Sequence, residues 1–218
     1  MSHITLIRHG QANSGAQDEA SYDKLSDLGH QQAQWLGHHL RDTHQQHQRL
    51  FTGTLQRHIE TADGMATGLT ATRDARLNEL EYFTLASALE AEQGIAIPTE
   101  QSEFVKHLPL VFSAWQAGEI EGAPETFDAF ETRVQNAISD IAAGDGPALV
   151  VTSGGLISMV MRQHLNLDVD GMAHIALAIM NTSMHRLFPI GGTRWAPVMF
   201  NSVAHLETPD RQHAQTHV

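Results

Sequence analysis

Alternating and continuous apolar stretches predict strands along this chain, and apolar residues three or four positions apart predict helices. The predicted strands are residues 3–8, 49–52, 70–73, 148–152, 184–188 and 195–203. The predicted helices are residues 26–45, 55–68, 125–143 and 154–165. Because the two patterns alternate, the sequence predicts an α/β fold: one domain with a mostly parallel central sheet and helices on both faces.

Two segments depart from this alternation. Residues 84–121 have a helical pattern that Pro98 and Pro109 are expected to interrupt, and we predict a helical insertion that packs over one edge of the sheet. Residues 208–218 are polar and are expected to be loose. The last two strands are expected to pair as a hairpin around Gly191-Gly192.

Composition narrows the class of protein. Hydrophobic residues make up 41% of the 218 residues and charged residues 17%, as in ordinary globular proteins. The formal net charge of −12 argues against a nucleic acid or an anionic membrane as partner, because both require a positively charged surface. The chain has no cysteine, no apolar run of about 20 residues and no signal-peptide pattern, so a cytoplasmic location is expected.

The tripeptide Arg8-His9-Gly10, at the end of the first predicted strand, is the main candidate for chemistry. Ligands of open α/β sheets bind beyond the carboxyl ends of the strands, where these residues lie. Arg8 can bind two phosphate oxygens, a neutral His9 imidazole can attack phosphorus, and Gly10 lets the backbone pass close to a ligand. Taken alone, the tripeptide is equally compatible with a structural histidine that is buried in the core with its hydrogen bonds made.

The tripeptide belongs to the first of five motif-like stretches along the chain. They are Leu6-Ile7-Arg8-His9-Gly10-Gln11, Leu25-Ser26-x-x-Gly29-x-x-Gln32-Ala33, Thr54-Leu55-x-Arg57-x-x-x-Thr61-Ala62, Leu77-Asn78-Glu79 and Val150-Val151-Thr152-Ser153-Gly154-Gly155. In order and spacing they resemble the histidine phosphatase superfamily, also called the phosphoglycerate mutase-like family. The resemblance covers most of the chain except the predicted insertion and the tail.

The resemblance implies roles for individual residues. His9 matches the nucleophile that becomes phosphorylated, and Arg8 and Arg57 match the phosphate-binding arginines. Glu79 matches the proton donor, which a leaving alcohol needs as its bond to phosphorus breaks. Glu81 remains a second candidate for this acid, because residues two apart in an extended segment point the same way.

The resemblance also implies that polar groups of the loop after His9 contact phosphate or substrate. Gln11, Asn13 and Ser14 are the candidates, although for Asn13 a role in capping the loop fits equally well. Gly154 opens a predicted helix, whose first backbone N–H groups can bind an anion.

Ser153 departs from the family pattern, which has a second histidine at this position. A serine hydroxyl can also donate a hydrogen bond to phosphate, but the serine side chain is shorter than that of histidine and carries no positive charge. Three outcomes follow: a slower enzyme, a nearby histidine such as His58 or His185 in the missing role, or a protein that only binds phosphate. Ser153→His is expected to raise turnover unless another group already serves that role.

The sequence therefore predicts a phosphomonoesterase that acts on a small phosphorylated substrate through a phosphohistidine at His9. Neither a metal nor a cofactor is expected, because the arginines supply the positive charge. The alternatives are a non-catalytic phosphate-binding or regulatory protein and, less favoured, a phosphoglycerate mutase.

In the family, the region after the acid motif forms a lid over the site. Here Lys106 is its one cation between residues 84 and 121, which disfavours a mutase that must hold two anionic groups. Four large apolar residues in this lid recur at helical spacing and are expected to form a packing face rather than substrate contacts: Phe104, Leu108, Phe112 and Trp115.

Overall fold

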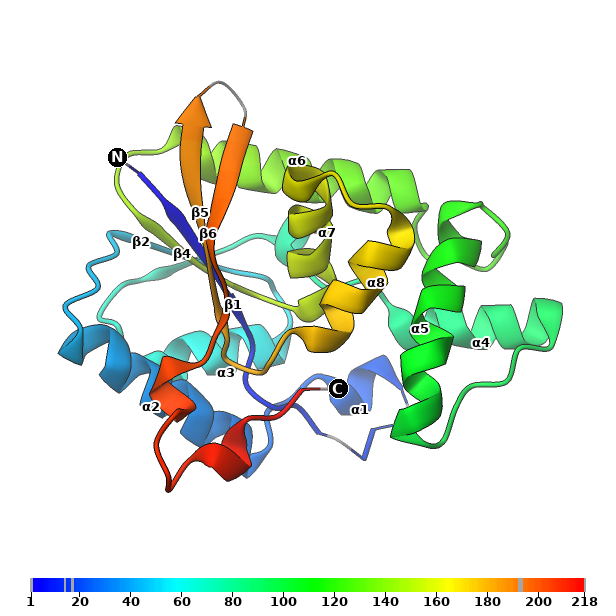
Figure 1. The fold of residues 1–218 in the computed structure, drawn as a ribbon, viewed down its shortest axis with the longest axis horizontal. Helices are drawn as coiled ribbons and strands as arrows, with labels where there is room; N and C mark the ends of the chain where they lie inside the picture. Colours follow the sequence, from blue (N-terminus) through cyan, green and yellow to red (C-terminus); the bar gives the residue numbers. More distant parts are fainter. Residues whose placement is uncertain (1, 14, 17, 192–193, 218) are drawn as a thin grey trace.

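One six-stranded sheet, with strand order β3-β2-β4-β1-β5-β6, forms the centre of the computed structural model, which describes residues 2–13, 15–16, 18–191 and 194–217 (Figure 1). The strands are β1 (Ile4–Arg8), β2 (Arg49–Thr52), β3 (Ala71–Arg73), β4 (Ala148–Thr152), β5 (Met184–Gly191) and β6 (Arg194–Ser202). The first four are parallel to one another, and β5 and β6 are added antiparallel. The predicted mostly parallel sheet is confirmed.

Helices cover both faces of this sheet. They are α1 (Glu19–Tyr22), α2 (Asp27–Asp42), α3 (Gln56–Met65), α4 (Tyr82–Gln93), α5 (Gln101–Gln116), α6 (Phe127–Ala143), α7 (Gly154–Leu165) and α8 (Val169–Ala178). Figure 1 shows α2 and α3 on one side of the strands and α6 on the other. Successive strand residues face opposite sides, so Ile7 and Val151 pack with Leu36 of α2, whereas Leu6 and Val150 belong to the core under α6 and α7.

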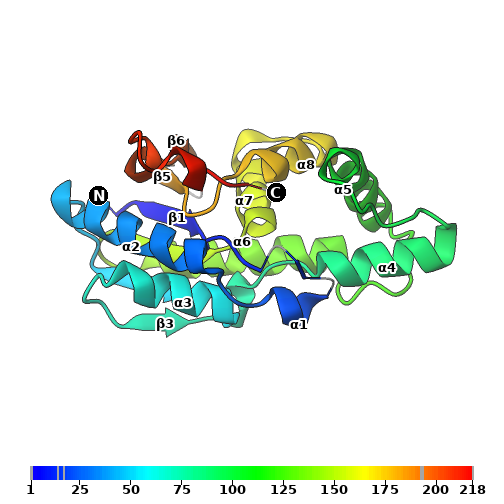
Figure 2. The same cartoon turned by 90° about the horizontal axis from the view of Figure 1, so that it is seen from below.

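The predicted insertion forms α4 and α5, which extend beyond the end of the strands (Figure 2). Pro98 lies between the two helices as expected, but Pro109 lies inside α5, so the prediction that it interrupts the helix is wrong. A proline costs the helix one hydrogen bond. Leu108 and Phe112 are almost completely buried on the same helix, and this apolar face keeps α5 continuous.

The described part of the tail, residues 208–217, is held in place, so the prediction of a loose tail is wrong there. The side-chain amide of Gln32 donates to the carbonyl of Ala214 at 2.7 Å and to Oγ1 of Thr216 at 3.0 Å. The backbone N–H of Asn181 donates to the Thr216 carbonyl at 2.8 Å. At the hairpin tip, Gly192 lies outside the described residues, but β5 and β6 pair as predicted.

Candidate active site

His9 lies at the carboxyl end of β1, and its backbone N–H donates to the carbonyl of Thr152, in β4, at 2.9 Å. The side chain is almost completely buried. Its Nδ1 lies 2.7 Å from the Gly10 carbonyl, which can only accept, so Nδ1 carries the proton and Nε2 keeps a free lone pair. Burial, followed by the charges of Arg57 and Arg8, lowers the pKa of His9 well below its ordinary value. The imidazole is therefore neutral at neutral pH.

Gly10 is required by close contact with α2 rather than with a ligand. A Cβ at this position would lie 2.5 Å from the carbonyl oxygen of Gly29. The Gly10 N–H donates to Oγ1 of Thr61 at 3.0 Å, and this hydroxyl donates to the carbonyl of Arg57 at 2.7 Å. The loop that carries His9 is thus fixed to both α2 and α3.

Two buried guanidiniums line the same cavity as His9. Arg8 is 8% exposed and Arg57 is 2% exposed. Nη1 of Arg8 donates to the carbonyl of Ile179, and Nη1 of Arg57 donates to Oδ1 of Asp23 at 3.0 Å. The Nε atoms of both arginines are buried without a hydrogen-bond partner among the described residues. Unused donors beside two positive charges are suited to an anion.

The Glu79 carboxylate lies at the start of α7 and lines the cavity. Its Oε2 accepts the N–H of Gly155 at 2.9 Å, and its Oε1 accepts the N–H of Leu80 at 3.0 Å. A Cβ at Gly155 would lie 2.5 Å from Oε1, so this close approach requires glycine. Glu81, in contrast, is exposed and does not line the cavity. The fold brings Glu79 rather than Glu81 to His9.

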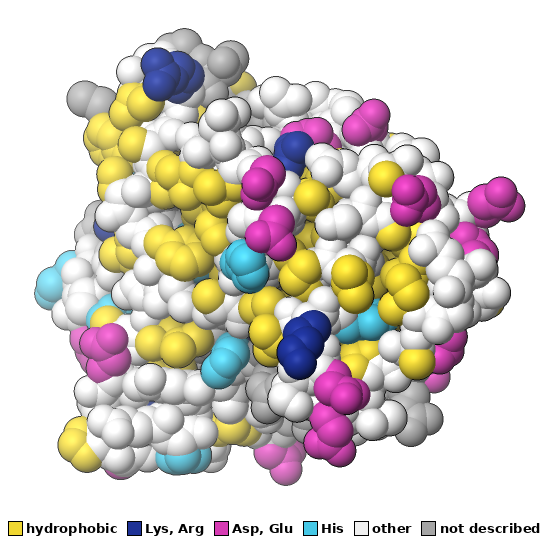
Figure 3. Space-filling model, turned by 45° about the vertical axis from the view of Figure 1, so that its right-hand side comes forward, with side chains coloured by type: hydrophobic (Ala, Val, Ile, Leu, Met, Phe, Trp, Pro, Cys, Tyr) yellow, Lys and Arg dark blue, Asp and Glu magenta, His cyan; other side chains and the backbone are white. Residues whose placement is uncertain are grey.

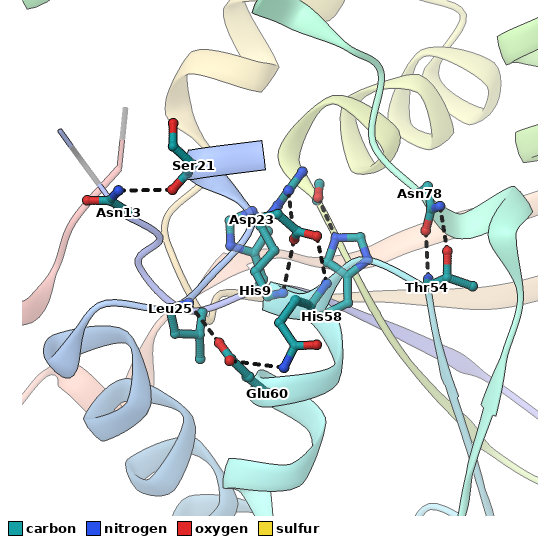
Figure 4. Close-up of polar contacts among 12 residues, drawn as sticks. His9, Asn13, Ser21, Asp23, Leu25, Thr54, His58, Glu60 and Asn78 are labelled. Atoms are coloured by element: carbon teal, nitrogen blue, oxygen red, sulfur yellow. Dashed lines mark hydrogen bonds and ion pairs between the residues drawn. The ribbon is translucent and has the colours of Figure 1, made fainter. Parts of the chain in front are cut away.

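Ser153 is completely buried and is not part of the cavity lining, whereas Gly154 beside it is. As the residue that precedes α7, Ser153 makes no side-chain capping bond. Its Oγ instead lies 2.6 Å from Nε2 of His58, which is also completely buried and lies beside His9 (Figure 4). His185, the other candidate for the missing role, bonds through its ring nitrogens to Ser183, just before β5, and to Asn201 of β6, and it does not line the cavity.

The two described loop candidates have different environments. Gln11 lines the cavity, and its Oε1 accepts the hydroxyl of Ser26 at 2.8 Å. Asn13 does not line the cavity, and its side-chain amide donates to the carbonyl of Ser21 at 2.9 Å (Figure 4). This bond fastens the loop to α1, which is the capping alternative that the sequence left open. Ser14 lies outside the described residues.

The cavity has a volume of about 420 Å³, and it is positively charged at one end and apolar at the other. Arg8 and Arg57 are the only lysine or arginine side chains that line it in the described part of the chain. The far end is formed by apolar side chains of α4, α5 and the segment between them: Phe83, Ile97, Pro98, Phe104, Leu108 and Phe112. Three of the four residues expected only to pack therefore also line the cavity, whereas Trp115 lies in the core alone.

Four residues around the cavity were not found by sequence reasoning. Asp23 binds Arg57, Tyr22 places its ring 5.0 Å from the Arg57 guanidinium carbon, and Asn181 donates to the His9 carbonyl at 3.2 Å. Glu19 lines the cavity, and burial raises its pKa to about 7. All four lie in or beside α1 and the turn after α8, neither of which was predicted as an element. No spacing in the sequence indicated that these residues meet.

Neither a metal site nor a membrane span is found in the described residues. No three of their histidine, aspartate and glutamate side chains are grouped so as to hold a metal ion. None of their helices combines the length and the apolar character needed to cross a bilayer. The prediction that catalysis needs no metal stays a prediction, to be tested with a chelator.

Solved structures with this fold include several phosphatases. A mycobacterial glucosyl-3-phosphoglycerate phosphatase, solved with inorganic phosphate, is 24% identical and has a TM-score of 0.67, covering 95% of this chain and 100% of the other. A phosphoserine phosphatase mutant from Entamoeba histolytica, solved with phosphoserine, is 17% identical with a TM-score of 0.68, covering 94% and 100%. The phosphoglycerate mutase of Bacillus anthracis is 21% identical with a TM-score of 0.65, covering 94% of each chain.

Sequence comparison gives the family directly. No curated protein matches the chain. The sequence profile of the histidine phosphatase superfamily (branch 1) matches residues 4–202, which include every motif described above. With His9, Arg8, Arg57 and Glu79 gathered around one cavity at the carboxyl edge of the sheet, this match means that the chain belongs to the histidine phosphatase superfamily, branch 1.

Proposed function

We propose that this protein is a phosphomonoesterase that hydrolyses a small phosphate monoester through a phosphohistidine at His9. The observation that carries the proposal is a neutral, buried imidazole with a free Nε2 lone pair in a cavity lined by two buried guanidiniums. Arg8 and Arg57 would balance the phosphate dianion and the charge that builds on its equatorial oxygens. Gly154, the first residue of α7, lines the cavity, and its backbone N–H adds a further donor.

In the first half of the proposed reaction, the Nε2 lone pair of His9 attacks phosphorus and the bond from phosphorus to the ester oxygen breaks. The leaving alcohol takes the proton of the Glu79 carboxyl group. In the second half, the Glu79 carboxylate removes a proton from water as the water oxygen attacks phosphorus. The phosphorus–nitrogen bond breaks, inorganic phosphate leaves, and His9 regains its lone pair.

The cavity favours a substrate whose remainder is neutral or apolar. Beyond Arg8 and Arg57, the described lining holds no lysine or arginine, and it includes the carboxylates Glu19 and Glu100. Lys106 is exposed on α5 and lies outside the lining. Figure 3 shows few lysine or arginine side chains among hydrophobic and acidic ones on the side that carries α5 and α8. A second phosphate or a carboxylate would thus find no further lysine or arginine in the described lining, which disfavours a phosphoglycerate mutase.

A second candidate is a protein that binds phosphate without turnover. It is favoured by the position of Ser153, whose hydroxyl bonds to His58 and is not part of the cavity lining. The phosphatases of this fold, solved with inorganic phosphate and with phosphoserine, favour the enzyme instead.

Hydrolysis of 4-nitrophenyl phosphate, measured with and without EDTA, separates these candidates. We expect equal rates in both buffers, and loss of at least about a thousandfold in His9→Ala, with phosphate binding retained. Full activity of His9→Ala would overturn the proposal. Phosphate binding with no turnover over a panel of monoesters would select the binding protein, and interconversion of 3- and 2-phosphoglycerate would select the mutase.

A further inference from the structure

A second buried imidazole backs the candidate nucleophile. His58 follows Arg57 in the first turn of α3, and its ring centre lies 5.7 Å from that of His9, with the planes inclined at 33°. A Cβ at Gly53 would lie only 2.3 Å from Nδ1 of His58, so the glycine after β2 leaves the room that this ring occupies. The pair of imidazoles is therefore built into the junction of β2 and α3.

The Ser153 hydroxyl bonds to His58 instead of capping the helix that follows it. A serine that precedes a helix usually accepts an N–H of the first turn through its side chain. Here the N–H of Gly155 donates to Glu79, and Ser153 Oγ lies 2.6 Å from Nε2 of His58. The hydroxyl thus joins α3 to the start of α7, on the side where His9 lies.

The protonation of His58 follows from its surroundings. Burial, followed by the charge of Arg57, lowers the pKa of His58 well below its ordinary value, so the ring is neutral. Nδ1 has no hydrogen-bond partner among the described residues. The contact between Nε2 and the Ser153 hydroxyl is thus the hydrogen bond that the described residues offer to this ring. A neutral ring can donate to the Ser153 hydroxyl or accept from it through Nε2, and either arrangement ties His58 to the start of α7.

We propose that His58 is a positioning residue for phosphoryl transfer, which rests on the function proposed above. Its ring backs the His9 imidazole, and its bond to Ser153 Oγ fixes that ring, so that the Nε2 lone pair of His9 stays aimed at the phosphoryl group. Ser153 is the residue between Thr152, which binds the His9 N–H, and Gly154, which lines the cavity. The bond from His58 to Ser153 therefore ties the ring that backs His9 to the strand end and helix start that frame the cavity.

A matched pair of variants tests this role. Glutamine at position 58 has a donor at about the reach of Nε2, and methionine has nearly the same size and shape without one. We expect His58→Met to lower kcat roughly ten- to a hundredfold and to weaken vanadate inhibition in parallel, because vanadate imitates the transition state. His58→Gln should stay within about fivefold of the wild type, and phosphate binding should change by less than about threefold in both.

A merely structural role would give a different pattern, because it would lower the unfolding temperature of both variants and weaken phosphate and vanadate alike. The proposal is overturned if His58→Met keeps the wild-type kcat and vanadate affinity, or if the two variants lose equally. The double variant Ser153→Ala/His58→Met gives a further check. The proposal is also overturned if the fold-loss in kcat of this double variant equals the product of the fold-losses of the two single variants, because residues that act as a pair do not have independent effects.

The experiments distinguish a failure of the proposed phosphatase function from a failure of the proposed role of His58. If the wild type does not turn over any monoester, the phosphomonoesterase proposal fails, but the vanadate-to-phosphate binding ratio of the same variants still tests the pair. If the wild type is active and His9→Ala is not, a wild-type result for His58→Met rejects the role of His58 alone.

Discussion

Asp23 accepts hydrogen bonds from both the backbone N–H and the side-chain Nη1 of Arg57, at 3.1 and 3.0 Å. Its other oxygen accepts the N–H of Gln56 at 2.9 Å. Leu55, the residue that precedes α3, has no side chain that could cap the helix. A carboxylate from the residue that follows α1 therefore caps α3 and holds one of the two cavity guanidiniums.

Asp23→Ala is expected to destabilise the protein by about 1–2 kcal/mol, because two backbone N–H groups lose their cap. Asp23→Asn keeps an oxygen acceptor and should lose less than half of that amount. Urea denaturation of the two variants and the wild type measures the difference. Equal free energies of unfolding for Asp23→Ala and the wild type would show that the Asp23 cap does not contribute to stability.

Glu79→Gln is expected to lower kcat by a factor of about 10²–10⁴ on an alkyl phosphate, whose alcohol must be protonated as it leaves. The loss should be much smaller on 4-nitrophenyl phosphate, because a phenolate with an electron-withdrawing group leaves without a proton. Glu81→Gln is the matched control and should keep near wild-type rates on both. Sensitivity of Glu81→Gln in place of Glu79→Gln would reassign the acid.

The KM of the enzyme should rise with pH because of Glu19. Burial raises the pKa of this cavity carboxyl to about 7, so it is neutral below that pH and anionic above it. Two like charges that share a partly solvated cavity repel by about 1 kcal/mol, which corresponds to a roughly fivefold rise in KM between pH 6 and 8. Glu19→Gln should remove most of this rise. An unchanged KM profile in the variant would exclude Glu19 as its source.

Stability should fall as the pH is lowered from 7 to 5, because burial lowers the pKa of His185 and of His205 to about 3. Their folded-state pKa values lie below the unfolded value of about 6.5, so only the unfolded chain takes up protons in this window. Each residue then contributes a loss of up to about 1.4 kcal/mol per pH unit below 6.5. Urea denaturation at the two pH values checks the slope, which His185→Gln should reduce.

Ser153→His alone is expected to bring no gain, contrary to what the sequence suggested. Ser153 Oγ and His58 Nε2 are 2.6 Å apart and completely buried, so an imidazole at position 153 overlaps His58. Overpacking of this kind costs roughly 1–3 kcal/mol. The double variant Ser153→His/His58→Ala has the room, and its kcat/KM should exceed that of His58→Ala by about tenfold or more. A single variant that outperforms the double would contradict this arrangement.

The sheet and the centre of the site could be predicted because strand ends are readable from sequence. Residues that directly follow neighbouring parallel strands must meet at one edge, which brings His9 after β1 together with Ser153 after β4. Arg57 joins them because α3 starts at the end of β2, the other neighbour of β4. The strand pattern predicted where these residues meet, and the resemblance to the family's motifs indicated which residues they are.

The rest of the site depends on contacts that have no periodic signal. Glu19 lies in a four-residue helix, which is too short to show helical spacing. Asn181 bonds to Thr216 of the tail, and Gln32 of α2 bonds to the same threonine, although the three residues are far apart in the sequence. His58 was one of two histidines considered for the role of the missing one, but its bond to Ser153 was not predicted, because sequence spacing does not decide which histidine reaches a buried hydroxyl.

Trapping of the phosphoenzyme tests the central claim most directly. The wild type and Glu79→Gln are mixed with a monoester, quenched in alkali because phosphohistidine is labile in acid, digested, and analysed by mass spectrometry. We predict one added phosphoryl group on the peptide that contains His9, more of it in Glu79→Gln, and none in His9→Ala. Turnover without a phosphorylated peptide, or with the phosphoryl group on another residue, would contradict the account.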